Sequence, residues 1–279
     1  MPFPDDKLQG GSAMPELPDV EAFKRYIDST ALHQSIRRVT VPAPKVLGDL
    51  SKRKLAQAVS GHTFTKSYRW GKHLFLALDS GQWLALHFGM TSRPRYGCKD
   101  SLDKSPDAAY DAVRFFFDNE YALAFNSRRK LGHIRLIDDP EHYGQGRKLG
   151  PDALELGKDE FVDIARKARG GLKSFLMNQK HLSGLGNETS DEILFQARWH
   201  PSAELRALDH EQYRKLYETM HRVLKADLDA NADQDRMPDW FILPRRHEGE
   251  PCPRCKSALR KIKASGRSAY ICPRCQPEP

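Results

Sequence analysis

The sequence lacks the features that would place the chain in a membrane or send it out of the cell. No stretch approaches the ~20 consecutive apolar residues of a membrane-spanning helix. Residues 1–13 contain no apolar core of the kind that secretion signals carry. Internal repeats and long low-complexity tracts are also missing, so a repeat architecture is not expected. These absences predict an intracellular protein without a membrane partner.

The composition is that of a globular chain with a surplus of basic residues. Its 279 residues suggest about two domains, since a domain commonly has roughly 150 residues. Hydrophobic residues make up 39% and charged residues 29%, with a mean hydropathy of −0.66. Lys and Arg number 45 against 37 Asp and Glu, which gives a net charge of +8. This surplus favours a polyanionic partner, although an ordinary basic protein would show it too.

Four of the five cysteines form two regularly spaced pairs. Cys252 and Cys255 are separated by two residues, as are Cys272 and Cys275, and sixteen residues lie between the pairs. Each pair can offer a metal two thiolates from one tight turn, and two pairs complete a tetrahedral zinc site. Two disulfides are the alternative, but an intracellular chain disfavours them. The spacing predicts one structural Zn²⁺ with no open coordination position, so chemistry must come from other residues, and Cys98 is expected to be a free thiol.

Hydropathy patterns predict an α+β fold that opens with a helix followed by an antiparallel β-sandwich. Asp19–Leu32 places its apolar residues on one helical face directly after Pro18. Alternating apolar and polar positions then predict strands in residues 72–79, 82–89, 113–117, 121–125 and 133–137. The polar segment 98–111 is expected to be a loop.

The second half of the chain has helical periodicity and ends in the cysteine hairpin. The clearest amphipathic stripe runs from Tyr213 to Leu228 and is expected to pack in a core. We therefore divide the chain into an extension that is disordered or not translated (1–13), a β-sandwich domain (14–143), a glycine-rich linker (144–151), a helical domain (152–245) and a zinc-finger β-hairpin (246–279).

Asn187 lies in the most informative segment of the helical half. Gly184 and Gly186 permit a tight turn before it, and Asn187 is predicted to be the N-cap of the next helix. An exposed helix start presents backbone amides, and with Lys173 and Lys180 nearby it can bind a DNA phosphate. The alternative is a plain helical hairpin, in which the glycines and the asparagine serve only the turn.

Three clusters of basic residues support a nucleic-acid partner. They are residues 69–73, residues 126–131 and the hairpin between the cysteine pairs, which carries Arg260, Lys261, Lys263 and Arg267. Each cluster alone is typical of a solvated surface. Three of them in one basic chain favour a shared DNA-binding groove.

The segment Met14–Glu21, MPELPDVE, resembles the opening of a protein family. It is similar to the PELPEVE of formamidopyrimidine-DNA glycosylases and their endonuclease VIII relatives. Three further segments agree in order: RWGKHLF with HFGMTS, then FLMNQKHLSGLGNETSDEILFQARWHP, then GEPCPRC with GRSAYICPRCQ. The second of these corresponds to the family's helix–two-turns–helix motif, and the resemblance covers Met14–Gln276.

The resemblance implies a base-excision-repair DNA glycosylase with an associated lyase activity. Its substrates would be oxidised or ring-opened bases and abasic sites in double-stranded DNA, and we expect a monomer in the cytoplasm, associated with the nucleoid. In the family an N-terminal proline attacks C1′ of the damaged nucleoside and forms an iminium. Pro15 would be this nucleophile and Glu16 the acid/base, and strand cleavage would follow by β and δ elimination.

Further site residues are implied by their positions in the motifs. Lys72, in the catalytic β-sandwich domain, would contact the phosphates of the lesion. Asn187 and Arg267 would clamp the DNA backbone beside an extruded nucleotide. Met90 would fill the stack that the nucleotide leaves, and Arg129 belongs to the strand-filling loop.

The chain departs from the family pattern at several positions. Pro15 is not the first residue, so its nitrogen is an amide unless translation starts at Met14 or the extension is removed. Leu131 stands where the family has an aromatic wedge, and residues 229–248 are shorter than the segment that caps oxidised guanine. Glu188 directly follows the phosphate-binding asparagine, so its carboxylate would weaken phosphate binding unless it turns toward the helix cap.

These departures leave two alternatives open. One is a catalytically silent relative that still binds damaged DNA. The other is a zinc-ribbon module that binds a protein partner, which would explain the cysteine hairpin but not the segment MPELPDVE.

Overall fold

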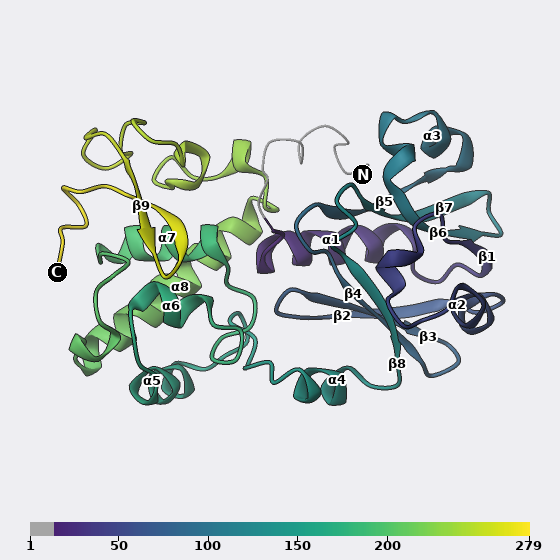
Figure 1. The fold of residues 1–279 in the computed structure, drawn as a ribbon, viewed down its shortest axis with the longest axis horizontal. Coiled ribbons are helices and arrows are strands. Elements are labelled where there is room, and N and C mark those ends of the chain that lie inside the picture. Colours follow the sequence, from purple (N-terminus) through teal and green to yellow (C-terminus); the bar gives the residue numbers. More distant parts are fainter. Residues whose placement is uncertain (1–13) are drawn as a thin grey trace. The chain divides into compact units, whose positions relative to one another are not determined.

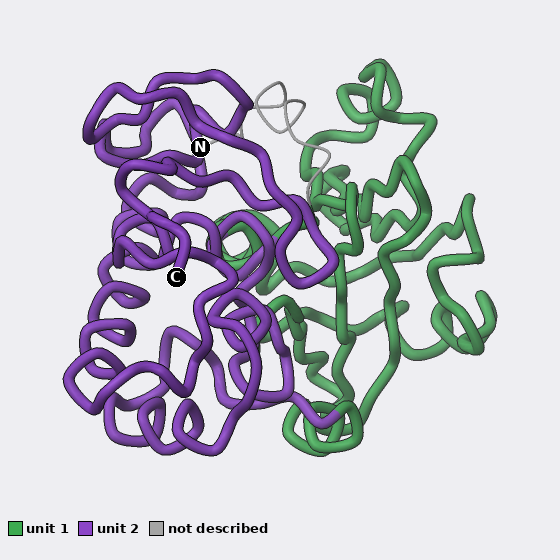
Figure 2. The backbone as a smooth tube through the Cα atoms, turned by 60° about the vertical axis from the view of Figure 1, so that its left-hand side comes forward, with its two compact units in different colours: residues 1–15, 19–147 green, residues 16–18, 148–279 purple. Residues whose placement is uncertain are grey.

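The computed structural model describes residues 14–279, and the proposed extension, residues 1–13, lies outside them. The chain forms two compact units, coloured separately in Figure 2. Of the described residues, unit 1 contains Met14, Pro15 and Asp19–Arg147, and unit 2 contains Glu16–Pro18 and Lys148–Pro279. No helix within the described part of the chain is both long and apolar enough to cross a membrane.

Unit 1 is a sandwich of two four-stranded antiparallel sheets (Figure 1). Their strand orders are β1-β6-β7-β5 and β2-β3-β4-β8. The strands are β1 Ile36–Thr40, β2 Phe64–Trp70, β3 His73–Leu78, β4 Trp83–His87, β5 Ser92–Cys98, β6 Asp111–Phe117, β7 Tyr121–Ser127 and β8 His133–Ile137. Leu76 of one sheet and Phe115 of the other belong to the same buried core. The predicted β-sandwich is confirmed.

Helix α1 spans Leu17–Thr30, two residues earlier at each end than predicted. Val20, Phe23 and Ile27 follow one another at helical spacing and are buried in the core of unit 1. Two further helical elements pack on the same core, namely η2 Pro44–Leu47 and α2 Lys52–Val59.

The segment predicted as a loop, residues 98–111, is largely helical. It contains α3 Lys99–Lys104 and the 3₁₀ helix η3 Pro106–Tyr110. Leu102 is buried against Phe116, so even this polar segment contributes an apolar side chain to packing.

The predicted linker begins inside a helix. Helix α4 spans Pro140–Gly146, and the two units divide between Arg147 and Lys148. A Cβ on Gly144 would collide with the ring of Trp70, so glycine at this position permits close packing rather than flexibility.

Unit 2 is helical and ends in a two-stranded hairpin (Figure 1). Its elements are α5 Lys158–Lys167, α6 Leu172–Met177, α7 Asn187–Ala197, η4 Leu205–Ala207, α8 His210–Asp229, η5 Gln234–Arg236, η6 Leu243–Arg245, β9 Arg260–Ala264 and β10 Arg267–Ile271. The predicted stripe on α8 packs with α5, α6 and α7 around one core. The helical domain and the terminal β-hairpin are therefore as predicted.

Candidate active site and nucleic-acid interface

The carboxylate of Glu16 accepts hydrogen bonds from the start of helix α7. Its Oε2 accepts from the backbone N–H of Gly186 at 2.9 Å and of Thr189 at 3.0 Å. Its Oε1 accepts from the N–H of Glu188 at 3.0 Å. Since Glu16 is only 5% exposed, these groups hold its carboxylate in one position directly after Pro15. The negative charge also complements the positive end of the helix dipole.

This clamp contradicts two predictions about Asn187. The asparagine is the first residue of α7, whereas the N-cap is Gly186, which has no side-chain cap. The amides of residues 186, 188 and 189 are not available to a phosphate, because they donate to Glu16. The Oδ1 of Asn187 is buried and has no hydrogen-bond partner among the described residues. The helix start therefore offers fewer free backbone amides than predicted.

The backbone next to Glu16 also lies close to the turn at Gly184, which helps to fix the position of Glu16. The N–H of Leu17 donates to the carbonyl of Gly184 at 3.0 Å. Gly184 has a φ of +114°, and a Cβ there would lie 2.6 Å from Cδ1 of Leu17. Glycine satisfies both constraints, so this turn glycine also helps to place the acid.

Lys173 is buried rather than presented to solvent. Its side chain is 0% exposed, and Nζ forms an ion pair with Asp191 and donates to the carbonyl of Ser268 at 3.3 Å. Burial lowers the pKa of Lys173, and the charge of Asp191 opposes this effect. The prediction that Lys173 contacts a phosphate is therefore corrected, because its ammonium has no exposed surface. It joins α6 to α7 and β10 instead.

Arg246 completes a charged cluster that the sequence prediction missed. Its Nε and Nη2 donate to Oδ2 of Asp191 at 3.0 and 2.8 Å, and its Nη1 donates to Oε1 of Glu188 at 3.0 Å. Oδ2 of Asp191 also accepts from the N–H of Tyr270 at 3.2 Å. Burial raises the pKa of both carboxyls, and the neighbouring cations oppose it. The sequence did contain one indication of this cluster. Acidic residues in a helix that is buried on most sides require cations nearby.

Glu192 anchors the segment that precedes the zinc-finger hairpin. Its side chain is fully buried, and Oε2 accepts from the N–H of Ile242 at 2.8 Å and of Leu243 at 3.0 Å. Oε1 accepts from Nε2 of Gln196 at 2.7 Å. Burial nevertheless raises the pKa of Glu192 to about 7.

We expect Glu192→Gln to change how the stability of this segment depends on pH. The folded protein holds a proton between about pH 4.5 and 7 that the unfolded chain releases. Glu192 is therefore most stabilising below pH 4.5 and becomes less so as the pH rises to 7, a change of about 3 kcal/mol. In wild type, the protection of the Ile242 and Leu243 amides from hydrogen exchange should be lower at about pH 8 than at about pH 5. In Glu192→Gln it should be the same at both pH values.

The matched control for this measurement is Glu248→Gln, which alters an exposed carboxylate shortly after Leu243 in the sequence. It should keep the wild-type dependence on pH. A Glu192→Gln variant that also keeps it would show that the buried carboxyl does not titrate in this range.

Three histidines form a row across the sheet that begins directly after Lys72. His73, His87 and His133 face one another on the neighbouring strands β3, β4 and β8, with 4.9 Å between ring centroids in both adjacent pairs. Burial lowers the pKa of His87 to about 3 and of His133 to about 4, and it also lowers that of His73. All three are therefore neutral near pH 7, so they add no positive charge beside Lys72.

The turn that carries Met90 lies against the loop that carries Arg129. The N–H of Arg129 donates to Oγ1 of Thr91 at 3.2 Å. Gly89 has a φ of +57°, and its lack of a side chain lets the backbone of Leu131 approach closely. Leu131 is 45% exposed. The structure therefore brings Met90, Arg129 and Leu131 together within unit 1.

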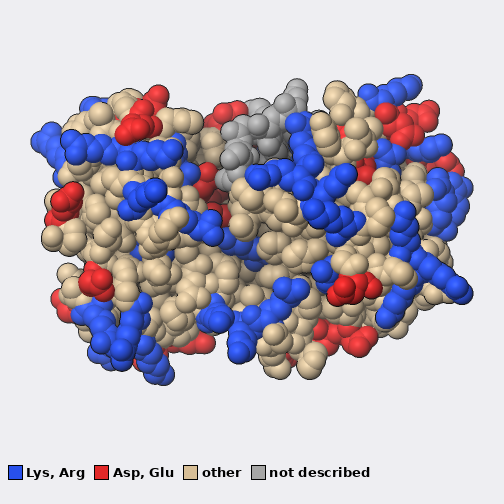
Figure 3. Space-filling view, in the orientation of Figure 1, with Lys and Arg blue, Asp and Glu red and all other residues tan. Residues whose placement is uncertain are grey.

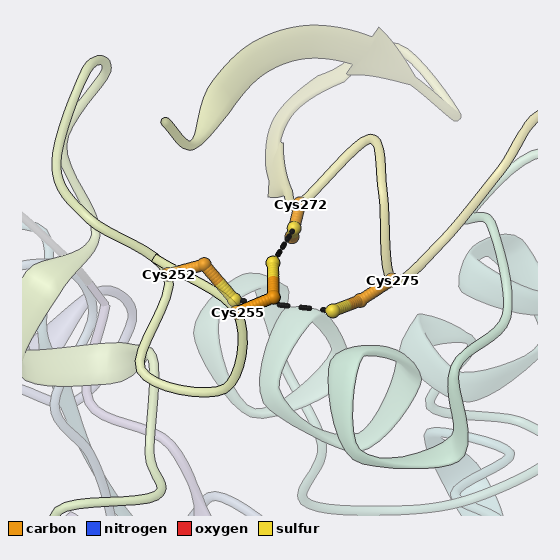
Figure 4. A group of neighbouring side chains, drawn as sticks. All are labelled: Cys252, Cys255, Cys272 and Cys275. Carbon is orange, nitrogen blue, oxygen red and sulfur yellow. Dashed lines mark hydrogen bonds between the residues drawn. The ribbon is translucent and has the colours of Figure 1, made fainter. Parts of the chain in front are cut away.

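The four paired cysteines meet at the base of the C-terminal hairpin (Figure 4). Their Sγ atoms lie within 4.8 Å of one another, with 4.0 Å between Cys252 and Cys275 and 3.4 Å between Cys255 and Cys272. A tetrahedral site with Zn–S bonds of ~2.3 Å requires sulfurs ~3.8 Å apart. All four are unbridged thiols, so they fit a closed tetrahedral metal site rather than the alternative of two disulfides.

Arg267 lies just after the tip of this hairpin. It pairs with Ala264 across a turn formed by Ser265 and Gly266, whose φ values are +53° and +72°. Arg267 is exposed, as are the other predicted basic residues of the hairpin, Arg260, Lys261 and Lys263. Figure 3 shows many Lys and Arg side chains on the face in view, with Asp and Glu side chains between them.

The predicted site residues other than the cysteines are divided between the units. Unit 1 contains Pro15, Lys72, Met90 and Arg129, and unit 2 contains Glu16, Lys173, Asn187 and Arg267. Within unit 2 the structure brings Glu16 to the helix start that carries Asn187.

Family models match nearly all of the described chain. The formamidopyrimidine-DNA glycosylase N-terminal domain matches residues 14–134, and the H2TH domain of the same family matches residues 149–238. A zinc finger found in FPG and IleRS matches residues 249–277. A β-sandwich, a helix–two-turns–helix domain and this zinc finger together define the class of zinc-finger DNA-repair glycosylases.

Individual relatives cover the whole of this arrangement. A formamidopyrimidine-DNA glycosylase of Heliobacterium modesticaldum is 33% identical over 282 residues, which cover 94% of this chain and 100% of the relative. That of Pelotomaculum thermopropionicum is 31% identical, with 94% and 99% covered. The crystal structure of the Lactococcus lactis glycosylase bound to DNA with an AP site has a TM-score of 0.82 at 25% identity, covering 94% of this chain and 100% of that one. The chain belongs to the formamidopyrimidine-DNA glycosylase family.

Proposed function

We propose that this protein is a bifunctional DNA glycosylase and abasic-site lyase of base excision repair, with Pro15 as nucleophile and Glu16 as acid/base. The main support is the clamp on Glu16, whose buried carboxylate is held by three backbone N–H groups directly after the proline. A carboxylate held in this way is ready to exchange protons with a sugar attached to Pro15, because it does not have to be ordered first.

The chemistry follows from a secondary amine at the start of the chain. An α-amine titrates at about pH 8, so a substantial fraction of the amine is unprotonated and nucleophilic at neutral pH. The nitrogen of Pro15 attacks C1′, and the damaged base leaves with the electron pair of the glycosidic bond. The nitrogen then loses its proton, and the C1′–O4′ bond breaks as O4′ is protonated, which leaves a cationic iminium between Pro15 and C1′. This iminium withdraws electrons while β and δ elimination release the 3′ and 5′ phosphates. Glu16 protonates the opening sugar and later moves protons during elimination.

The other site residues act on the DNA around the extruded nucleotide. Lys72, Asn187 and Arg267 bind its phosphates, which helps to offset the few kcal/mol of base flipping. Met90 and Arg129 fill the gap in the duplex, together with the exposed Leu131.

The substrate class is double-stranded DNA with oxidised or ring-opened bases or abasic sites. The Lactococcus lactis relative was solved with DNA that contains an AP site and, in a second structure, with a FAPY-dG containing DNA, which supports these substrates. One structural Zn²⁺ held by the four paired cysteines would keep the hairpin of Arg267 folded. We propose that the protein acts as a monomer in the cytoplasm, on the DNA of the nucleoid.

Borohydride trapping tests this function. The full printed chain and a chain that begins at Pro15 are each incubated with a duplex containing an abasic site or an oxidised base, and intact mass verifies each N-terminus. A covalent adduct and strand cleavage are expected only when Pro15 is terminal, because an amide nitrogen is not a nucleophile.

Other outcomes would redirect the proposal. If a verified terminal Pro15 gives no adduct although the duplex is bound, the protein is a silent binder of damaged DNA. If neither chain binds the duplex, the zinc-ribbon alternative with a protein partner is favoured.

A further inference from the structure

Three carboxylates gather at the start of helix α7, where the proposed function requires a phosphate to approach. Glu16 accepts hydrogen bonds there, Glu188 is the second residue of the helix, and Asp191 lies one turn further on. Burial raises the pKa of Glu188, Arg246 opposes this, and the charges of Glu16 and Asp191 raise it further. Without compensation, these negative charges would repel a phosphate at the neighbouring asparagine.

Arg246 supplies the compensation, and three of its five N–H donors are engaged in it. Nε and Nη2 donate to Asp191 and Nη1 donates to Glu188, all within 2.8–3.0 Å. The guanidinium also lies 4.8 Å from the ring centroid of Tyr270 on β10. Its side chain is only 13% exposed. The carboxylates therefore fix the orientation of the guanidinium, and its low exposure leaves little of it for a direct contact with DNA.

The two carboxylates depend on Arg246 to different degrees. Asp191 also forms an ion pair with the buried Lys173, so it keeps a cation if Arg246 is removed. Among the described residues, the cation paired with Glu188 is Arg246. Loss of Arg246 would therefore leave an uncompensated carboxylate directly after Asn187.

We propose that Arg246 is a positioning residue that neutralises Glu188 and so keeps the start of α7 open to the phosphate that Asn187 binds. This inference rests on the proposed function, because it concerns the same DNA-binding surface. Arg246 acts through the charge and orientation of Glu188 and makes no contact with DNA itself.

A double-mutant cycle on a chain that begins at Pro15 tests this role, with binding measured to a duplex carrying a tetrahydrofuran abasic analogue. Arg246→Gln should weaken binding about ten-fold or more, because it exposes the phosphate to the charge of Glu188. Glu188→Gln alone should stay within about three-fold of wild type, and the double variant should return to that range. A double variant that binds as weakly as Arg246→Gln would overturn the inference.

The salt dependence of binding separates this role from direct contact. If Arg246 touches no phosphate, the slope of log Kd against log salt concentration is the same in wild type and in Arg246→Gln. A slope smaller by about 0.9 in the variant would mean that one phosphate contact was lost, which contradicts a positioning role.

Further variants separate charge from folding. Arg245→Gln removes the same charge from the adjacent residue and should change binding less than about three-fold. Arg246→Lys keeps the cation and should retain most of the affinity, and zinc content and Tm are measured for every variant. If affinity follows Tm in all variants, including the double one, Arg246 is merely structural and the inference fails.

The wild-type chain distinguishes the inference from the function on which it rests. A wild-type protein that binds no abasic duplex would overturn both. A wild-type protein that binds the duplex, with binding unaffected by Arg246→Gln, would overturn the inference alone.

Discussion

Replacing Glu16 with glutamine is expected to reduce cleavage of an abasic-site duplex by about 10²- to 10⁴-fold, because an amide cannot deliver and take up a proton. Glutamine keeps the shape of the side chain, but its Nε2 would face an N–H group of α7, since all three hydrogen bonds here need an acceptor. The free energy of unfolding should also fall by about 1–3 kcal/mol through the lost acceptor. Single-turnover cleavage and denaturant unfolding measure the two effects separately.

Asp209→Ala is the matched control for Glu16→Gln. Asp209 caps helix α8 in the same unit and accepts from the N–H of Gln212 at 2.8 Å. Its loss should cost about 0.5–2 kcal/mol and leave cleavage unchanged. If Glu16→Gln likewise lost only stability, with cleavage within about three-fold of wild type, Glu16 would be a helix cap and not the acid/base.

The parts of the molecule that the sequence predicts correctly depend on local patterns. Each hairpin joins residues close in the chain, as in β3 and β4, whose partners meet across a short turn. The cysteine site is also local, because all four thiols belong to one short segment that can fold around a metal. Alternation and spacing are sufficient where the interacting residues are neighbours in sequence.

The clamp on Glu16 could not be predicted from local patterns, because its partner at Gly186 is 170 residues away. A glycine followed by an asparagine before a helix looks the same whether the cap comes from that asparagine or from a distant acid. The local interpretation made Asn187 the N-cap, whereas a carboxylate from the start of the chain is the stronger acceptor. The prediction failed at the point where a long-range contact replaced a local one.

Lys173 and the acidic residues of α7 show a second limit. Eight of the eleven residues of α7 are buried, including Asp191 and Glu192, so polarity does not mark the exposed face of this helix. The cations that make this burial possible come from α6 and from the segment before the hairpin, as Lys173 and Arg246. A lysine beside a predicted phosphate-binding turn suggests a DNA ligand, although its partner is a carboxylate inside the unit.

Replacing Cys272 with serine is expected to unfold the C-terminal hairpin and to abolish tight binding of the abasic duplex. A serine hydroxyl is a much poorer zinc ligand than a thiolate, and structural zinc sites contribute about 10 kcal/mol or more to folding in isolated fingers. The hairpin has only two strands, and its small core contains Leu259 and Ile242 besides the cysteines themselves. Such a hairpin is marginally stable without the metal. Zinc content, hydrogen exchange of residues 249–277 and duplex affinity report the loss.

Cys98→Ser provides the matched control, because Cys98 is an exposed thiol in unit 1. It should retain zinc, hairpin protection and affinity. In Cys272→Ser, protection should be lost in the hairpin and kept in the β-sheets of unit 1, which have a core of their own. If Cys272→Ser kept its hairpin protected without zinc, the contacts of Lys173 and Asp191 with β10 would be sufficient to hold that strand. Affinity would then depend on Arg267 and not on the metal.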